Sequence, residues 1–230
     1  MTSSHPIPLD QIRAWLFDLD GTLMDTDDQA VEALTKRLGF LGSQRAARLA
    51  RRLVMMSETP MNQILTIIDL IGLDALLFAL SRRLTKGAIK PTFRVIRDVK
   101  PVITKVSSLG SVAIVSTRSE EDATEFLRQH QLTEFFELTV TRETTLRLKP
   151  HPEPILYAAE KLGVPPTACV MVGDTPVDML SAVRAGAWGI GVLCGFGDAP
   201  ELRRAGAHVV LPSTGDILEL FEPEATKTRA

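Results

Sequence analysis

Two carboxylates stand one residue apart after a short apolar run near the start of the chain, in the stretch WLFDLDGTL. Asp18 and Asp20 repel each other, and removing either from water is costly, so the pair needs a compensating charge. Two more acids, Asp174 and Asp178, follow another apolar run in the stretch VMVGDTPVD. Carboxylates without histidine or cysteine among them favour Mg²⁺ over zinc or copper. The sequence therefore predicts a Mg²⁺ site among these acids, in which the ion neutralises Asp18 and Asp174 together.

A lysine and a group of polar residues accompany these acids. Lys149 stands in the stretch LKPHPEP, and the run VAIV is followed by Ser116, Thr117 and Arg118. A lysine beside carboxylates suits the transfer of an anionic group. Ser116 and the amides after it can hold phosphoryl oxygens at the end of a strand. We therefore expect Ser116, Thr117 and Arg118 to contact the substrate.

An ionised carboxylate in this setting is a credible nucleophile, because aspartyl phosphate is a known covalent intermediate. Asp18 is expected to take that role. Asp20 is near enough to give a proton to the leaving oxygen and later to take one from water. Each stretch alone is common in loops, but together they follow successive strand-like runs. The combination predicts Asp18, Asp20 and Lys149 as the catalytic residues.

Six short apolar runs are typical of buried strands, and most of them alternate with stretches of helical periodicity. This alternation predicts an α/β fold with a parallel sheet that is covered by helices on both faces. Ligands of such sheets bind beyond the carboxyl ends of the strands, which is where the polar residues named above fall. The predicted strands are Ala14–Phe17, Val112–Val115, Leu138–Val140, Cys169–Val172, Gly189–Leu193 and His208–Leu211.

One long interval, residues 25–97, contains no convincing strand. Its apolar residues recur at helical spacing, which predicts an all-helical domain inserted into the α/β core. The core would then comprise residues 11–24 and 98–222, with flexible termini at 1–10 and 223–230.

The inserted part is also basic, with 13 Lys and Arg against 5 Asp and Glu between residues 30 and 100. We hypothesise that some of its arginines attract an anionic substrate, although periodicity places most of them toward solvent. These arginines are Arg45, Arg48, Arg51, Arg52, Arg82 and Arg83.

Composition excludes several classes of protein. The formal net charge of −2 over 230 residues gives no reason to expect a nucleic-acid partner. The two cysteines, Cys169 and Cys194, fit reduced thiols in a cytosolic protein. The apolar stretch 61–80 contains two aspartates and a glycine, so a buried helical hairpin explains it better than a membrane span. With no secretory signal at the start, we expect a cytoplasmic protein that binds a small phosphorylated substrate; a homodimer is compatible with the sequence.

Four stretches resemble the motifs of the haloacid dehalogenase superfamily, in the order and spacing typical of its phosphatase branch. They are DLDGTL, VAIVST, LKPHPEP and VMVGDTPVD. The later stretches GFG and AGAHVV are similar to those of phosphoglycolate phosphatases. The resemblance implies a Rossmann-like sheet sandwiched by helices, with the insertion as a helical cap of the C1 type that closes over the site.

The resemblance also implies a role for each site residue. Thr117 departs from the family, which often has Asn at this position. The resemblance implies that Asp18 is the nucleophile and a Mg²⁺ ligand, and that Asp20 is the acid/base with its backbone carbonyl on the metal. Ser116 would bind the phosphoryl group, and Lys149 would stabilise its charge and that of Asp18. Asp174 would complete the metal site, and Asp178 would support it, directly or through water.

Several readings of the function stay open. Dehalogenases of the superfamily lack the second acid of the first motif, so Asp20 favours phosphate ester hydrolysis over carbon–halogen cleavage. The same chemistry could act on pyrophosphate or a nucleotide, or return the phosphoryl group to a sugar as in phosphosugar mutases. A phospho-ligand-binding scaffold needs no nucleophile and acid pair, and a signalling receiver needs neither Asp20 nor the long insertion.

Overall fold

The computed structural model describes residues 6–25 and 92–222 of the chain. The chain divides into two compact units, one formed by Met1–Thr26 and Phe93–Ala230 and the other by Asp27–Thr92. All the predicted site residues belong to the first unit. Nearly all of the predicted helical insertion, including the hairpin expected at 61–80 and most of its arginines, lies outside the described residues, so the cap stays a prediction.

The first unit contains one six-stranded sheet in which all strands are parallel, in the order β3-β2-β1-β4-β5-β6. The predicted α/β class and all six predicted strands are confirmed, with bounds that differ by at most one residue. The strands are β1 (Ala14–Phe17), β2 (Ser111–Val115), β3 (Leu138–Val140), β4 (Cys169–Gly173), β5 (Trp188–Val192) and β6 (Val209–Leu211).

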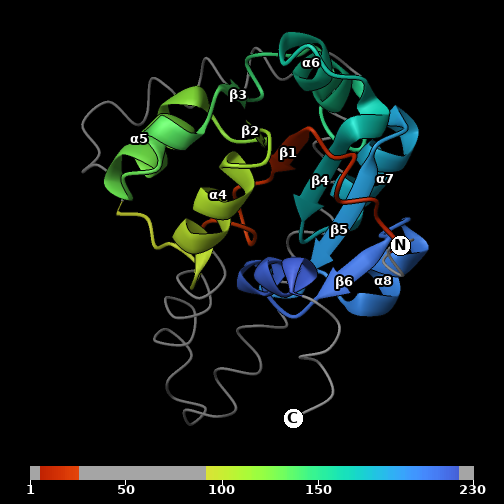
Figure 1. Ribbon diagram of the computed structural model, residues 1–230. Helices are drawn as coiled ribbons and strands as arrows, with labels where there is room; N and C mark the ends of the chain where they lie inside the picture. The colour runs from red at the N-terminus through yellow and green to blue at the C-terminus, as the bar shows by residue number, and fades with distance from the viewer. Residues whose placement is uncertain (1–5, 26–91, 223–230) are drawn as a thin grey trace, which may run out of the picture. The chain divides into compact units, whose positions relative to one another are not determined.

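Helices connect these strands (Figure 1). The α-helices are α4 (Val99–Ser107), α5 (Glu120–Gln129), α6 (Glu153–Lys161), α7 (Pro176–Ala185) and α8 (Ala199–Arg204). The 3₁₀ helices are η2 (Thr133–Phe135), η3 (Pro166–Ala168) and η4 (Thr214–Phe221). No helix among the described residues is both long and apolar enough to cross a membrane.

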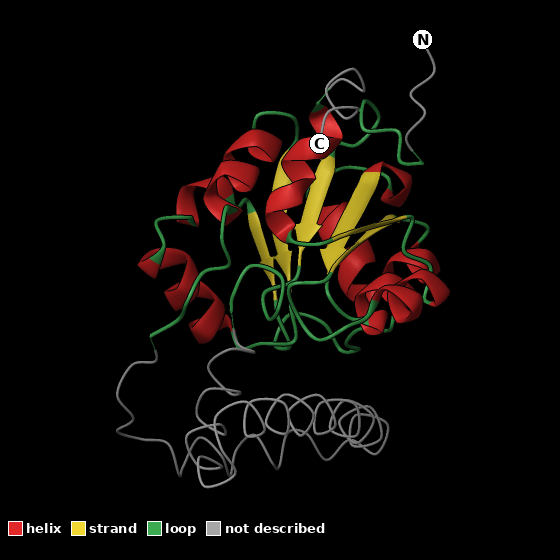
Figure 2. Ribbon diagram, turned by 90° about the horizontal axis from the view of Figure 1, so that it is seen from below, coloured by secondary structure: helices red, strands yellow, loops and turns green. Residues whose placement is uncertain are grey.

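Alternation along β1 explains how the sheet is covered on both faces. Successive side chains of a strand point to opposite faces, so Trp15 and Phe17 enter one core while Ala14 and Leu16 enter the other. Helices α4 and α5, with η4, supply the apolar partners of the first face, and α6 and α7 those of the second. Figure 2 shows the strands with helices on either side. β1 is therefore buried along its whole length and is a rigid support for the residues at its carboxyl end.

Local capping contacts fix helix ends in this unit. The Ser119 hydroxyl accepts a hydrogen bond from the Asp122 amide at the start of α5. Gly186 ends α7 in the left-handed conformation at φ 78°, which glycine adopts at little steric cost.

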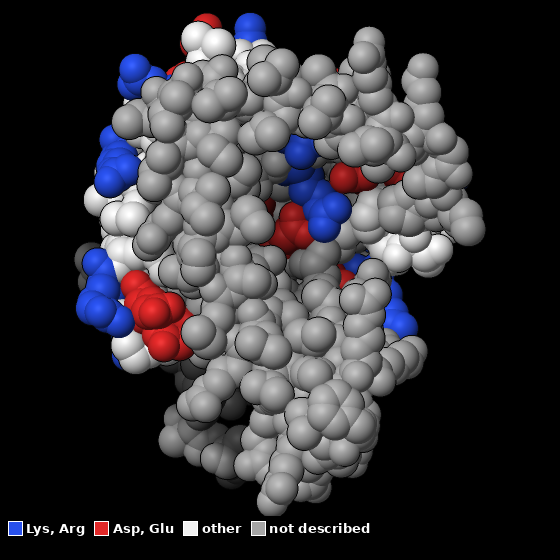
Figure 3. Space-filling model, turned by 180° about the vertical axis from the view of Figure 1, so that it is seen from behind, with Lys and Arg blue, Asp and Glu red and all other residues white. Residues whose placement is uncertain are grey.

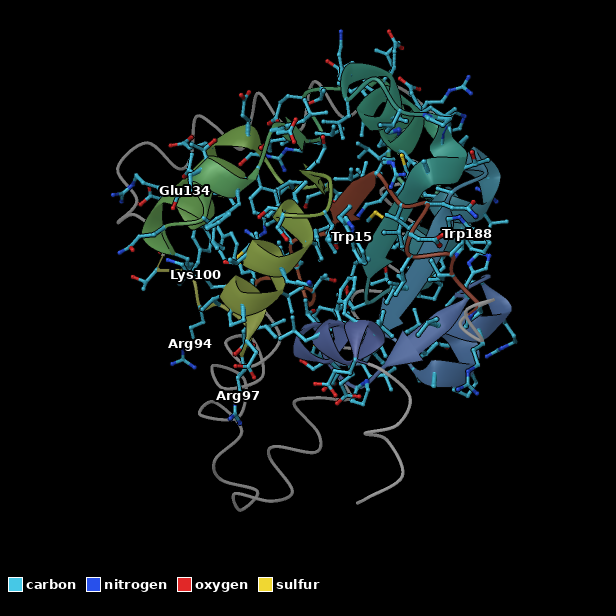
Figure 4. All side chains as sticks on the ribbon, viewed as in Figure 1. Trp15, Arg94, Arg97, Lys100, Glu134 and Trp188 are labelled. Carbon is cyan, nitrogen blue, oxygen red and sulfur yellow. The ribbon has the colours of Figure 1, made fainter. Side chains whose placement is uncertain are left out.

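The two chain segments on either side of residues 26–91 run next to each other. The Asp25 amide donates to the Arg94 carbonyl and the Ile96 amide donates to the Leu23 carbonyl, both at 2.9 Å. Just before this pairing, Phe93 is buried and packs edge-on against Phe126 of α5. Figure 4 shows Arg94 and Arg97 pointing away from the sheet, whereas Trp15 lies inside. The chain thus leaves the first unit and returns to it at neighbouring points.

Candidate active site

The centre of the sheet places Asp18 at its carboxyl edge. β1 lies between β2 and β4, and the Asp18 amide extends the pairing by donating to the Val172 carbonyl at 3.0 Å. Asp18 is buried, with 7% of its surface exposed. Because connections run to both sides from β1, this edge is the switch point where ligands bind in open parallel sheets.

Three carboxylates meet at this edge. One oxygen from each of Asp18, Asp174 and Asp178 lies within 4.8 Å of the others, and all three residues are buried. The donors are hard oxygens, which matches the preference of Mg²⁺. The arrangement therefore fits a divalent cation, with Asp18 and Asp174 as the residues best placed to hold it.

Lys149 lies among these acids and uses all three of its N–H donors. Its Nζ is 2.9 Å from Asp18 Oδ1, 2.6 Å from Asp178 Oδ1 and 2.8 Å from the Val115 carbonyl oxygen. Its side chain is 3% exposed; burial acts to lower the pKa of the ammonium, but the two carboxylates outweigh it and raise that pKa. An ammonium has three donors, so Lys149 is committed to holding Asp18 and Asp178 in place.

The buried, acidic surroundings make the Asp18 carboxyl group harder to ionise. Burial raises the pKa of Asp18 to about 7; Lys149 opposes that rise, while Asp178 and Asp20 add to it. The single positive charge of Lys149 therefore does not compensate for burial and for the negative charges of the neighbouring acids. A cation beside Asp18 and Asp174 would favour the ionised carboxylate, which is the form that a nucleophile needs.

Asp178 is held from two sides by the protein itself. Its Oδ1 accepts from Lys149, and its Oδ2 accepts from the Thr175 amide at 3.1 Å and the Thr175 hydroxyl at 2.6 Å. This reciprocal pairing at the start of α7 fixes the side chain against the helix. Asp178 therefore holds Lys149 in place, and its part in the metal site, directly or through water, stays a prediction.

Asp174 is fixed by two segments that are distant in the sequence. Its Oδ1 accepts from the Thr22 hydroxyl at 3.2 Å, and its Oδ2 accepts from the Phe196 amide at 2.8 Å. Gly21, at φ 66°, and Gly195 both lie so close that a Cβ on either would overlap the Asp174 carboxylate. The motif loop and the loop after β5 therefore form a tight cradle for one carboxylate.

Gly195→Ala should lower the affinity for Mg²⁺, and this loss should exceed what a general loss of stability would cause. The added methyl group must push the Asp174 carboxylate or the loop aside, which moves a ligand from its position. We expect Mg²⁺ affinity to fall by about 10- to 100-fold, as for changes to residues that orient metal ligands. Titration calorimetry with Mg²⁺ and the rise in Tm on adding Mg²⁺ measure this loss.

Gly163→Ala is the control for the stability cost of such a change. Gly163 follows α6 at φ 68°, and a Cβ there would meet no atom within 4 Å. The control should lower Tm through backbone strain while leaving Mg²⁺ affinity intact. Equal Mg²⁺ affinities in Gly195→Ala and the wild type would contradict the cradle.

The residues that follow β2 reach the same edge but differ in surroundings. Ser116 is buried and its hydroxyl accepts from the Arg118 amide at 3.2 Å, whereas Thr117 is exposed. Ser116 and Thr117 follow β2, which is paired with β1, and their contacts with substrate stay a prediction. Arg118, which was expected to act with them, directs its guanidinium to Asp20.

Asp20 is the most accessible acid of the group. Its side chain is 30% exposed, and Arg118 NH2 lies 2.7 Å from its Oδ1. Basic and acidic side chains also lie next to one another on the face shown in Figure 3. The structure thus brings all the predicted site residues to one edge, with Asp18 and Lys149 inside and Asp20 at the rim.

Sequence reasoning missed the residues that hold the acids in place. Thr22 and the Phe196 amide bind Asp174 across 152 and 22 residues of sequence, and no local pattern indicates either contact. The partner of Asp178 was visible, since Thr175 and Asp178 have the spacing of a capping box.

A comparison with protein families adds an independent line of evidence. Residues 15–192 match the model of the haloacid dehalogenase-like hydrolases. The chain belongs to the haloacid dehalogenase-like hydrolase family. The resemblance drawn from the four motifs is thereby confirmed, and the match spans the strands from β1 to β5 with the site residues between them.

Relatives in this family differ in their reactions. The chain is 29% identical to a phosphoglycolate phosphatase from Neisseria meningitidis, over 95% of this chain and 97% of the relative. It is 26% identical to the pyrophosphatase PpaX from Anoxybacillus flavithermus, over 91% and 97%. The solved structure of L-2-haloacid dehalogenase from Xanthobacter autotrophicus shares the fold, with a TM-score of 0.62 and 17% identity over 95% of this chain and all of the other. The fold alone does not decide the reaction.

Proposed function

We propose that this chain is a Mg²⁺-dependent phosphatase that hydrolyses a small phosphomonoester through an aspartyl-phosphate intermediate. The observation that carries the proposal is the buried Asp18, paired with Lys149 among three carboxylates at the carboxyl edge of the sheet, with Asp20 at its rim. The phosphoglycolate phosphatase among the relatives points to a small organic phosphate of that kind as substrate.

In the first half-reaction, a carboxylate oxygen of Asp18 attacks the phosphorus atom and the bond to the ester oxygen breaks. Asp20 donates a proton to that oxygen, which leaves as an alcohol. Lys149 keeps Asp18 oriented, and Ser116 with Thr117 binds the phosphoryl oxygens. Asp18 and Asp174 would hold a Mg²⁺ ion, which would supply positive charge to stabilise the negative charge of the reacting phosphoryl group.

In the second half-reaction, a water molecule attacks the phosphorus atom of the aspartyl phosphate. Asp20, now ionised, takes a proton from that water, and the phosphorus–oxygen bond to Asp18 breaks. Phosphate leaves and the Asp18 carboxylate is restored. The same residue thus acts as an acid and then as a base, as microscopic reversibility requires of a shared proton carrier.

Asp20 is the residue that favours an ester over a halide. Halide ions leave without a proton, whereas an alkoxide is a poor leaving group until it is protonated. Hydrolysis of a phosphoanhydride such as pyrophosphate would use the same residues of this chain. Because PpaX, a pyrophosphatase, is among the relatives, this reaction is the second candidate. The insertion, whose basic residues lie mostly outside the described part of the chain, is expected to select among them.

Phosphate release from a panel of substrates tests the proposal. The panel contains phosphoglycolate, sugar phosphates, nucleoside monophosphates and pyrophosphate, each with Mg²⁺ and with a chelator. We expect release from small monoesters that depends on Mg²⁺. Preference for pyrophosphate would favour the second candidate, and no release from any compound would favour a binding protein that retains the site.

Asp20→Asn should separate substrates by their leaving groups. An alkyl phosphate needs a proton at the leaving oxygen, so we expect kcat/KM to fall by about 10²- to 10⁴-fold. p-Nitrophenyl phosphate needs no such help, and its kcat/KM should fall far less. Equal losses on the two substrates would show that Asp20 is not the acid.

A further inference from the structure

Arg118 makes the most directional contact in the site outside the buried cluster. Its Nε lies 3.0 Å from Asp20 Oδ1 and 2.8 Å from Oδ2, and its NH2 lies 2.7 Å from Oδ1. Two nitrogens of one planar group thus grip both oxygens of one carboxylate. Such bidentate pairing fixes the orientation of the carboxylate as well as its distance.

Separate elements hold Arg118 itself. Its NH1 lies 3.4 Å from Asp122 of α5, whose amide binds the Ser119 hydroxyl at the helix start. Its guanidinium carbon lies 5.8 Å from the centre of the Phe93 ring, on the segment that returns from residues 26–91. Phe93 is fixed in turn, since its amide donates to Gln129 Oε1 at 3.0 Å. The guanidinium is therefore a rigid support rather than a loose surface charge.

These contacts leave Arg118 poorly suited to a primary role in binding phosphate. Each of its three nitrogens faces a carboxylate, two facing Asp20 and one facing Asp122. The pair is also part-exposed, at 28% and 30%, so it contributes little to stability. Stability therefore does not explain the bidentate geometry of the Arg118–Asp20 pair, and a functional role does.

We propose that Arg118 is a positioning residue that holds the Asp20 carboxylate for the second half-reaction. The inference rests on the proposed function and deepens it. Because Arg118 grips both oxygens of Asp20, the carboxylate keeps one orientation toward the water that attacks the aspartyl phosphate. A base displaced by about 1 Å loses much of its effect. Loss of Arg118 should therefore slow hydrolysis of the aspartyl phosphate and spare its formation.

p-Nitrophenyl phosphate isolates this step, because its leaving group needs no proton and its first half-reaction does not depend on Asp20. For Arg118→Gln we expect kcat to fall by about 10- to 100-fold, as for a misplaced catalytic group, with kcat/KM unchanged. A burst of p-nitrophenol should precede the steady state, and acid-quenched enzyme should carry the phosphoryl group by intact mass. Arg118→Lys, which keeps the charge without the planar fork, should recover part of kcat.

A double variant tests whether Arg118 acts through Asp20. Adding Arg118→Gln to Asp20→Asn should cost nothing further in kcat, since residues that act as one unit are not additive. Arg204→Gln is the control, because Arg204 Nε on α8 donates to the Pro200 carbonyl and not to a residue of the site. It should behave as the wild type, and the Tm of every variant reports folding.

Three results would overturn the inference. A fall in kcat/KM without a burst would make Arg118 a substrate contact, and a further loss in the double variant would separate it from Asp20. Wild-type kinetics in Arg118→Gln would remove any role. A wild-type enzyme without phosphatase activity would instead overturn the proposed function, so the two failures are distinguishable.

Discussion

Asp18→Asn will abolish turnover, and this is the largest effect that the structure predicts. The amide has nearly the same shape as the carboxylate, but it cannot form the bond to phosphorus. We expect kcat to fall by at least about 10⁴-fold, as when the nucleophile of a catalytic group is removed. Phosphate release from the best substrate of the panel, and the mass of quenched enzyme, measure the change.

Folding provides the control for Asp18→Asn. Asp18 is a buried acid whose pKa is raised to about 7, chiefly by burial, so removing its charge removes a desolvation cost. The metal-free variant should melt at the wild-type temperature or above it. A stable variant that still releases phosphate would contradict Asp18 as the nucleophile.

Lys149→Met should have large effects on both stability and activity. Methionine keeps the length of the side chain but leaves Asp18 and Asp178 buried without their shared cation. Breaking a buried pair in this way costs about 3–5 kcal/mol, so the free energy of unfolding should fall by that order. Activity should fall by about 10²- to 10³-fold, because Asp18 loses the group that orients it.

Denaturant unfolding of four proteins resolves the contribution of the pair. They are the wild type, Lys149→Met, Asp178→Asn and the double variant. Asp178→Asn in the Lys149→Met background removes one of the stranded charges, so it should restore part of the lost stability but none of the activity. Additive losses of stability would mean that Lys149 and Asp178 do not act as a unit.

Much of the fold could be predicted because its signals are local. The run Ala14–Phe17 is apolar at every position, and a strand buried on both faces needs that pattern. Ser119 starts α5 and Gly186 ends α7 through contacts within a few residues. Given the strands, a parallel sheet brings Asp18, Ser116 and Asp174 to one edge without further information.

The contacts that tune the site could not be predicted in the same way. Arg118 and Asp20 are 98 residues apart, and only their positions after neighbouring strands bring them together. The sequence suggested that Arg118 binds substrate, because a basic residue at this edge suits an anion. Whether its guanidinium turns to the anion or to an acid depends on Asp122 and Phe93, and such side-chain competition leaves no periodic signal.

The pairing of Leu23–Asp25 with Arg94–Ile96 bears on how such proteins diversify. Because the chain leaves and re-enters the first unit at adjacent points, the two ends of the inserted segment are already held together by the core. The entropic cost of closing a loop grows slowly, by about 0.6 kcal/mol for each doubling of its length. An insertion at this place can therefore lengthen, shorten or be exchanged while the nearby acids keep their positions. Evolution can then change the sequence between these two segments and leave the acids at the edge of the sheet unchanged.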